Sequence, residues 1–319
     1  MDQLKKNDFS WRRFIGNYAI LMALAILIVI ITVNRPQFLS GQNIINILRQ
    51  ASVTGLIAIG MTFVVLTGGI DLSVGYIFAA AGMAAALTAQ NHDLPAILPV
   101  LAGLGVGFAM GALNGVVVAY LKVPAFIATL GVQSFARGIA LYVTDAKPVP
   151  GLSDQFLQIG KGDVLGIPIP AFIMLAVLVI SFILLYNCKY GRHVYAVGGS
   201  RSAAIISGVK VKPVEMSTYI ICGLLSGLSG AVMTARVSSG IANIGQGYET
   251  DAIAAVVMGG TSLMGGRGRL WGTIVGFMFM TIMNIGLDMM NFKTPIQLMI
   301  KGALIIAAVM LDSLAQSDK

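Results

Sequence analysis

Charged residues are scarce in this chain. Only 11% of its 319 residues are charged, while 57% are hydrophobic. A soluble globular domain is nearer to a quarter charged. Because so few charges cannot cover a water-soluble globule of this size, the composition excludes a soluble domain and indicates a protein that lies in a lipid bilayer.

Groups that bind metals or carry out catalysis are also few. The cysteines, Cys188 and Cys222, and the histidines, His92 and His193, do not have the spacing of metal ligands or of a disulfide framework. The sequence contains no G-x-x-x-x-G-K-[ST], H-E-x-x-H or G-x-S-x-G motif, and the glycine-rich stretch 259–268 lacks the lysine that a phosphate-binding loop needs. We therefore expect no enzyme, no metal and no cofactor in this chain.

Ten apolar segments follow one another along the sequence, and no linker divides them into separate soluble domains. They span residues 18–33, 51–66, 74–89, 97–119, 126–143, 170–186, 216–235, 253–264, 271–287 and 296–311. A straight transmembrane helix needs about 20 residues, so several segments are short and the eighth is expected to be broken or partly re-entrant. The pattern predicts an all-α integral membrane protein with about ten transmembrane helices, the first of which is retained because no small-residue cleavage site follows it.

The net charge of +8 does not indicate a nucleic-acid partner, because the basic residues lie between apolar runs. Their distribution instead indicates how the protein is oriented in the membrane. With the N-terminus in the cytoplasm, 13 of the 21 lysines and arginines fall inside, namely Lys5, Lys6, Arg12, Arg13, Lys122, Lys189, Arg192, Arg201, Lys210, Lys212, Arg267, Arg269 and Lys319. Cytoplasmic loops carry the excess of Lys and Arg. Residues 1–16, 187–215 and 312–319 are therefore predicted to be cytoplasmic.

Two glycine-rich stretches, 68–75 and 259–266, share a G-G-x-x-L-x-x-G spacing. Both join apolar segments on the predicted cytoplasmic side. Paired segments interrupted by glycine can mark a duplicated transporter core. In a chain with 38 glycines, chance explains four matching positions equally well.

Charges at membrane depth are rare, and Asp71, Arg137 and Lys301 lie near segment ends, where their side chains can reach water. Their scarcity argues against a proton- or sodium-coupled carrier. Asp71 has two interpretations: part of the N-cap of the following helix, where Asp71 or Ser73 can accept backbone amide bonds, which is favoured, or a polar contact with substrate or a gate. Three charges flanking the loop after the seventh segment are expected to be solvated, although docking of an external partner is an alternative: Arg236, Glu249 and Asp251.

The cytoplasmic segment 187–215 contains a predicted short helix. Ser200 is a good N-cap, Gly208 is a good C-terminal stop, and small and apolar residues lie between them. Such a helix, followed by Lys210 and Lys212, could lie on the membrane surface or fill a groove on a cytoplasmic partner. The residues alone favour neither.

Four stretches resemble the permease subunit of ribose-type ABC importers, the monosaccharide branch of bacteria: 60–62 with the string LTGGIDLSVG at 66–75, then 124–130, 191–208, and 251–257 with 259–263. The resemblance extends over most of the chain. It implies one permease domain over 1–319 with the ten-helix fold of the cobalamin importer (type II), in the bacterial plasma membrane. It also implies a second permease chain, a periplasmic or lipoprotein sugar-binding protein, and a cytoplasmic two-domain ATPase that hydrolyses the ATP.

The resemblance further implies that the short cytoplasmic helix is the coupling helix, which would insert into the ATPase. The residues concerned are Gly198, Gly199, Ser200, Arg201, Ala203, Ala204, Ser207 and Gly208. Within this reading, the substrate path is expected at Asp71 and along the fifth segment, where Phe126, Thr129 and Gln133 share one helical face, although packing explains Phe126 and Thr129 as well. The competing hypothesis is a secondary carrier or channel for a small polar solute.

Overall fold

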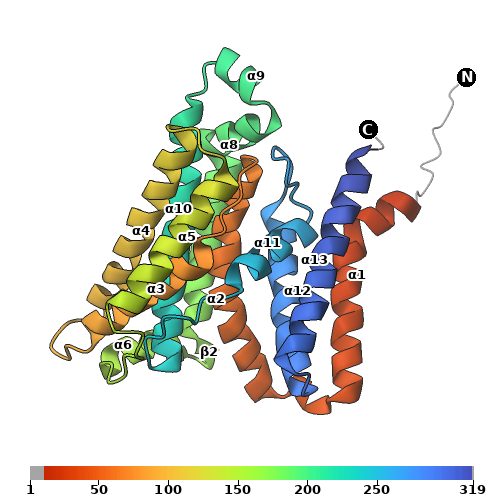
Figure 1. Ribbon diagram of the computed structural model, residues 1–319. Coiled ribbons are helices and arrows are strands. Elements are labelled where there is room, and N and C mark those ends of the chain that lie inside the picture. Colours follow the sequence, from red (N-terminus) through yellow and green to blue (C-terminus); the bar gives the residue numbers. More distant parts are fainter. Residues whose placement is uncertain (1–10, 318–319) are drawn as a thin grey trace, which may run out of the picture.

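The computed structural model describes residues 11–317, and its long helices run roughly parallel as one bundle (Figure 1). Residues 1–10 and 318–319, parts of the predicted cytoplasmic ends, lie outside the described residues. The elements in chain order are α1 (Trp11–Asn34), the 3₁₀ turn η1 (Pro36–Leu39), α2 (Gly41–Leu66), α3 (Val74–Ala89), α4 (Ile97–Ala119), α5 (Ala125–Tyr142), α6 (Asp154–Lys161), β1 (Asp163–Val164), β2 (Ile167–Pro168), α7 (Ile169–Phe182), the π-helical turn η2 (Ile183–Asn187), α8 (Lys189–Gly199), α9 (Arg201–Ile206), α10 (Val211–Val237), α11 (Tyr248–Met258), α12 (Leu270–Met289) and α13 (Thr294–Ser317).

Six helices in the described part of the chain are long and apolar enough to cross a membrane: α2, α4, α5, α7 continued by η2, α10 and α12. Three shorter apolar stretches lie in α1, α3 and α13. The eighth predicted segment became α11, whose 11 residues are too few for a straight span. The all-α membrane class is therefore confirmed, and the weak eighth segment is a short helix.

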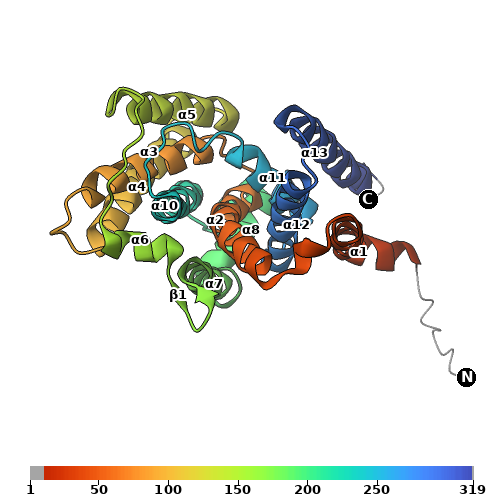
Figure 2. The same cartoon turned by 90° about the horizontal axis from the view of Figure 1, so that it is seen from below.

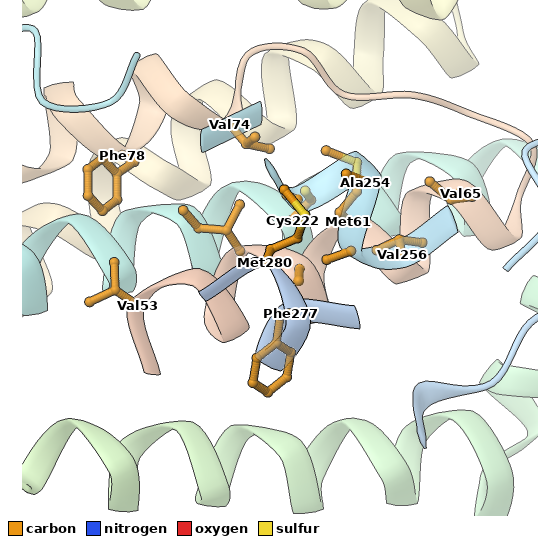
Figure 3. Close-up of a cluster of buried hydrophobic side chains, with 14 of the residues drawn as sticks. Val53, Met61, Val65, Val74, Phe78, Cys222, Ala254, Val256, Phe277 and Met280 are labelled. Carbon is orange, nitrogen blue, oxygen red and sulfur yellow. The ribbon is translucent and has the colours of Figure 1, made fainter. Parts of the chain in front are cut away.

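Helix α10 lies inside the bundle and packs against α2, α3 and α4 (Figure 2). Glycines on α4 and α10 allow this approach: a Cβ atom on Gly111 would lie 2.5 Å from the Tyr219 carbonyl oxygen, and one on Gly227 would lie 2.5 Å from that of Gly103. Such contacts between small residues are how helices pack closely in lipid. Beside the contact between α4 and α10, the largest buried apolar cluster is formed by Met61, Cys222, Phe277 and other side chains from several helices (Figure 3).

Helix ends differ from the predicted segments where polar residues continue a helix. α2 begins at Gly41 instead of residue 51, because its first turns carry asparagines, glutamines and Arg49 ahead of the apolar run. α11 ends at Met258 instead of residue 264, because Gly260 has φ +83°, which a helix does not tolerate. Three elements in the two long loops were not predicted: α6, the β1–β2 hairpin and α8.

Candidate functional site

The short helix predicted in the segment 187–215 is present as α9. The Ser200 hydroxyl accepts a 3.3 Å hydrogen bond from the amide of Ala203, which is the bond of an N-cap. Gly208, with φ +79°, ends the helix in the left-handed conformation that favours glycine. Arg201 forms an ion pair with Glu215 on α10, so the start of α9 is tied to a long helix.

The two faces of α9 differ in exposure. Ala204 is buried, with 3% of its surface exposed, whereas Ile205 and Ile206 are 58% and 87% exposed. Ala203 and Ser207 are also exposed. At this end of the bundle (Figure 1), three connections, 120–124, 187–215 and 259–269, carry eight basic residues and one acidic residue, Glu215. α9 therefore presents an apolar tip on a strongly basic surface.

Helix α8 holds α9 against the bundle through two tyrosines. The Tyr190 hydroxyl lies 2.8 Å from that of Ser217 on α10. The Tyr195 hydroxyl donates a 3.0 Å hydrogen bond to the carbonyl oxygen of Gly268, in the loop between α11 and α12. Burial raises the pKa of Tyr190 to about 12 and raises that of Tyr195 as well, so both hydroxyls keep their protons at neutral pH.

The two stretches that share a glycine spacing meet each other at α8. The amide of Gly266 donates a 2.9 Å hydrogen bond to the Leu66 carbonyl oxygen at the end of α2. A Cβ atom on Gly265 would lie 2.7 Å from the Gly68 amide nitrogen and 3.0 Å from Gly198 Cα. Gly198 in turn lies so close to Leu66 that a side chain there would clash with the carbonyl oxygen. Backbones from three chain segments therefore form one glycine seam, defined here as Leu66, Gly68, Gly198, Gly265 and Gly266.

Asp71 lies inside the bundle, which corrects the expectation that its side chain reaches water. It is fully buried, and its carboxylate accepts hydrogen bonds from the amide and the hydroxyl of Ser73 at 2.9 and 2.5 Å. Asn114 on α4 donates to the same carboxylate at 3.4 Å and to the Ser73 hydroxyl at 2.8 Å. Ser73 stands at the N-cap position of α3 but its side chain makes no capping hydrogen bond, and the backbone amide of Ser73 donates to Asp71 instead. Asp71 therefore joins the α2–α3 loop to α4.

The three predicted pathway residues of α5 do not share one exposed face. Phe126 is 57% exposed and Gln133 is half-buried, but Thr129 is buried and its hydroxyl bonds to the backbone one turn earlier. Arg137, farther along α5, reaches an aromatic partner, since its guanidinium lies 5.3 Å from the ring centre of Tyr76. The structure brings neither Thr129 nor Asp71 to the surface.

The charges around the start of α11 are not solvated, so the favoured interpretation of them was wrong. Asp251 is buried, and its carboxylate contacts Lys301 on α13 and Asn284 on α12, both at 3.0 Å. Glu249 is half-buried and accepts a hydrogen bond from the amide of Gly247 at 3.3 Å. The missed signal is the lysine in the tenth apolar segment, because a charge at membrane depth needs a partner.

Arg236 at the end of α10 is also engaged within the bundle. Its guanidinium donates to the Gln50 side chain at 2.5 Å and to the Asn46 side chain at 2.9 Å, both on α2. These are the polar first turns of α2 that the apolar pattern had left out. The contacts link α2 to α10 at the end of the bundle opposite α9 (Figure 1).

Metal-binding residues do not gather in the part of the chain that the structure describes. No group of three or more His, Cys, Asp or Glu side chains there could hold an ion. Both cysteines are free thiols, and Cys222 is buried.

Comparisons with known proteins agree with this description. Residues 43–309 match the family described as "Branched-chain amino acid transport system / permease component". The chain is 44% identical to the ribose import permease protein of Bacillus subtilis over 91% of each chain, and 42% identical to that of Haemophilus influenzae over 98% of each chain. It is 39% identical to the D-allose transport system permease protein of Escherichia coli, over 97% of this chain and 95% of that one.

No solved structure matches the chain. The family match covers most of the sequence, and the relatives named above align over nearly their whole length. The chain therefore belongs to this family of ABC transporter permease components, which are membrane pore subunits and not enzymes.

Proposed function

We propose that this chain is the pore-forming permease subunit of an ATP-driven importer for a monosaccharide, with ribose as the first candidate. The observation that carries the proposal is the arm formed by α8 and α9: a capped short helix that exposes an apolar tip and is tied to the bundle by hydrogen bonds. The names of the relatives, ribose import and D-allose transport permeases, support the substrate class.

The α9 end of the bundle faces the cytoplasm in this proposal. The connections 120–124, 187–215 and 259–269 at this end carry eight basic residues against one acidic residue, which supports this orientation. The described ends of α1 and α13 lie at the same end (Figure 1), so both termini are cytoplasmic. Counting α1, α3, α11 and α13 with the six long spans gives ten passages or partial passages, in agreement with the cobalamin-importer (type II) fold.

The partner at the cytoplasmic end is a two-domain ATPase, and α9 inserts into a groove on it. Ile205 and Ile206 are the side chains that reach the groove, because Ala204 on the other face of α9 is buried in the bundle. An apolar anchor with a polar rim is the usual form of such a docking site. The flanking Gly198, Gly199 and Arg201 orient the helix, and Ser207 and Gly208 end it.

A second copy of the chain completes the pore along the edge where α5, α11 and α13 lie side by side (Figure 2). The outer face of α5 is open there, since a Cβ atom on Gly131 or Gly138 would meet nothing within 4 Å. Phe126 and Gln133 line the substrate path on this face, whereas Thr129 and Asp71 stabilise the bundle behind it. A periplasmic or lipoprotein sugar-binding protein delivers the sugar at the opposite end of the bundle.

Affinity co-purification with the ATPase in mild detergent tests the proposal. The wild-type chain is expected to retain the ATPase, and an Ile206→Glu variant is expected to bind it at least tenfold more weakly, since a charge cannot enter an apolar groove. Leu165→Glu is the matched control, because Leu165 is 97% exposed in the β1–β2 hairpin at the other end. A wild-type chain that purifies alone and moves a solute without ATP would overturn the importer and favour a carrier or channel.

A further inference from the structure

We propose that Tyr195 is a positioning residue that transmits the movement of the α8–α9 arm to α11 and α12 through the loop 259–269. The proposal rests on the proposed function, because it assumes that α9 receives the motion of an ATPase. It adds the route by which this motion enters the membrane part of the chain.

The route begins with one side-chain bond between the arm and the loop. The Tyr195 hydroxyl, on α8, donates to the Gly268 carbonyl oxygen at 3.0 Å. Two residues later, the amide of Leu270 at the start of α12 donates to the Tyr186 hydroxyl at 2.9 Å. The C-terminal part of the loop is thus held between two tyrosines that lie on either side of the start of α8.

The glycine seam makes this connection stiff. Gly266 is bonded to Leu66 through their backbones, and Gly198 and Gly265 approach with no side chain between them. Closely packed backbones cannot be compressed, so they move as one body rather than absorbing a displacement. A shift of α8 therefore moves the loop at Gly265 and Gly266 with it, whereas the end of the loop at Gly268, which leads into α12, follows α8 through the Tyr195 hydroxyl.

The loop leads to α11, the helix best suited to act as a gate on the proposed substrate path. α11 has only 11 residues, is preceded by Gly247 with φ +89°, and is flanked by α5 and α13 at one edge of the bundle (Figure 2). Its Asp251 contacts Lys301 on α13 at 3.0 Å. Movement of the loop would thus displace α11 and, through this ion pair, α13.

A competing route leaves the arm through the other tyrosine of α8. Tyr190 contacts Ser217 at 2.8 Å and would carry the motion directly into α10. α10 is packed against α2, α3 and α4 along its length, so it is the least free helix of the bundle. The two tyrosines therefore offer a matched pair of variants, each of which loses one hydroxyl on the same helix.

The test uses the reconstituted complex with ATPase and ribose-loaded binding protein in proteoliposomes, and it measures sugar molecules imported per ATP hydrolysed. Tyr195→Phe is expected to keep ATPase association, thermal stability and basal hydrolysis, and to lower this ratio roughly fivefold. Tyr186→Phe, which removes the acceptor for Leu270, is expected to lower it in the same direction. Tyr190→Phe is expected to leave the ratio close to that of the wild type.

An unchanged ratio in Tyr195→Phe, or an equal loss in Tyr190→Phe, would overturn the proposed route. A fall in ratio that is matched by loss of thermal stability would also overturn it, since Tyr195 would then be only a packing residue. Failure of the wild-type chain to associate with the ATPase is a different result, which contradicts the proposed function instead.

Discussion

Lys301 on α13 and Asp251 on α11 form a 3.0 Å ion pair inside an apolar bundle, and Asn284 on α12 completes it. One carboxylate therefore joins three helices, α11, α12 and α13. A buried pair costs desolvation free energy when it forms, but a single remaining charge costs more. The pair thus fixes the position of the short helix α11.

Lys301→Met is expected to lower the free energy of unfolding by about 3 kcal/mol, because it leaves Asp251 buried without a cation. Thermal unfolding in detergent measures the effect. The exposed Lys293 supplies the control, since Lys293→Met should leave the melting temperature unchanged. The double variant Lys301→Met, Asp251→Leu should recover most of the loss; equal melting temperatures for Lys301→Met and wild type would show that the pair contributes nothing.

Gly198→Ala and Gly199→Ala are expected to differ, although the residues are neighbours at the end of α8. A methyl group on Gly198 would clash with the Leu66 carbonyl oxygen, whereas one on Gly199 meets nothing within 4 Å. Gly198→Ala should therefore cost about 2 kcal/mol or more of stability, and Gly199→Ala should cost almost none. The amount of folded protein after solubilisation and its melting temperature measure both; similar behaviour of the two variants would contradict the glycine seam.

The sequence gives Ala203 and Ala204 the same expected role in the coupling helix, but in the structure Ala203 is exposed and Ala204 is buried. Ala203 lies on the exposed side of α9. Ala203→Glu should therefore leave the chain folded and weaken ATPase association about tenfold. Ala204→Glu buries a charge and should destabilise the chain by several kcal/mol. Size-exclusion profiles and ATPase binding distinguish the two effects. Normal ATPase binding and transport by Ala203→Glu would contradict the coupling role of α9.

Asn114→Leu is expected to destabilise the α2–α3 loop, because Asn114 donates to both Asp71 and Ser73 in the bundle interior. Removing these donors leaves buried acceptors unpaired and should cost about 1–3 kcal/mol. Asn91→Leu, in the exposed turn after α3, is the control. Proteolysis and thermal unfolding report the change, and equal stability of the two variants would show that the Asp71 contacts are not needed.

The sequence was sufficient for features that depend on local physics. Apolar length predicted the membrane class, and the cap at Ser200 with the stop at Gly208 predicted α9. It was insufficient where distant residues pair. The sequence around Asp251 predicts a solvated charge, because its partner, Lys301, is 50 positions away.

The missed helices have physical reasons as well. α8 contains Gly191, Gly198 and Gly199, and glycine has a low helix propensity, so the sequence does not predict this helix. Gly198 is nevertheless needed there, because a side chain would clash with the Leu66 carbonyl oxygen. Tertiary packing overrides propensity there. The repeat of glycine spacing at 68–75 and 259–266 was ambiguous on the sequence, and only the structure places the two stretches in contact.

The most direct test of the account is uptake of labelled ribose into proteoliposomes that contain this chain, with its ATPase and binding protein supplied or withheld. The account predicts uptake only when ATP, the ATPase and the binding protein are all present, and no uptake by the chain alone. Uptake by the chain alone, driven by a proton, sodium or sugar gradient, would contradict it.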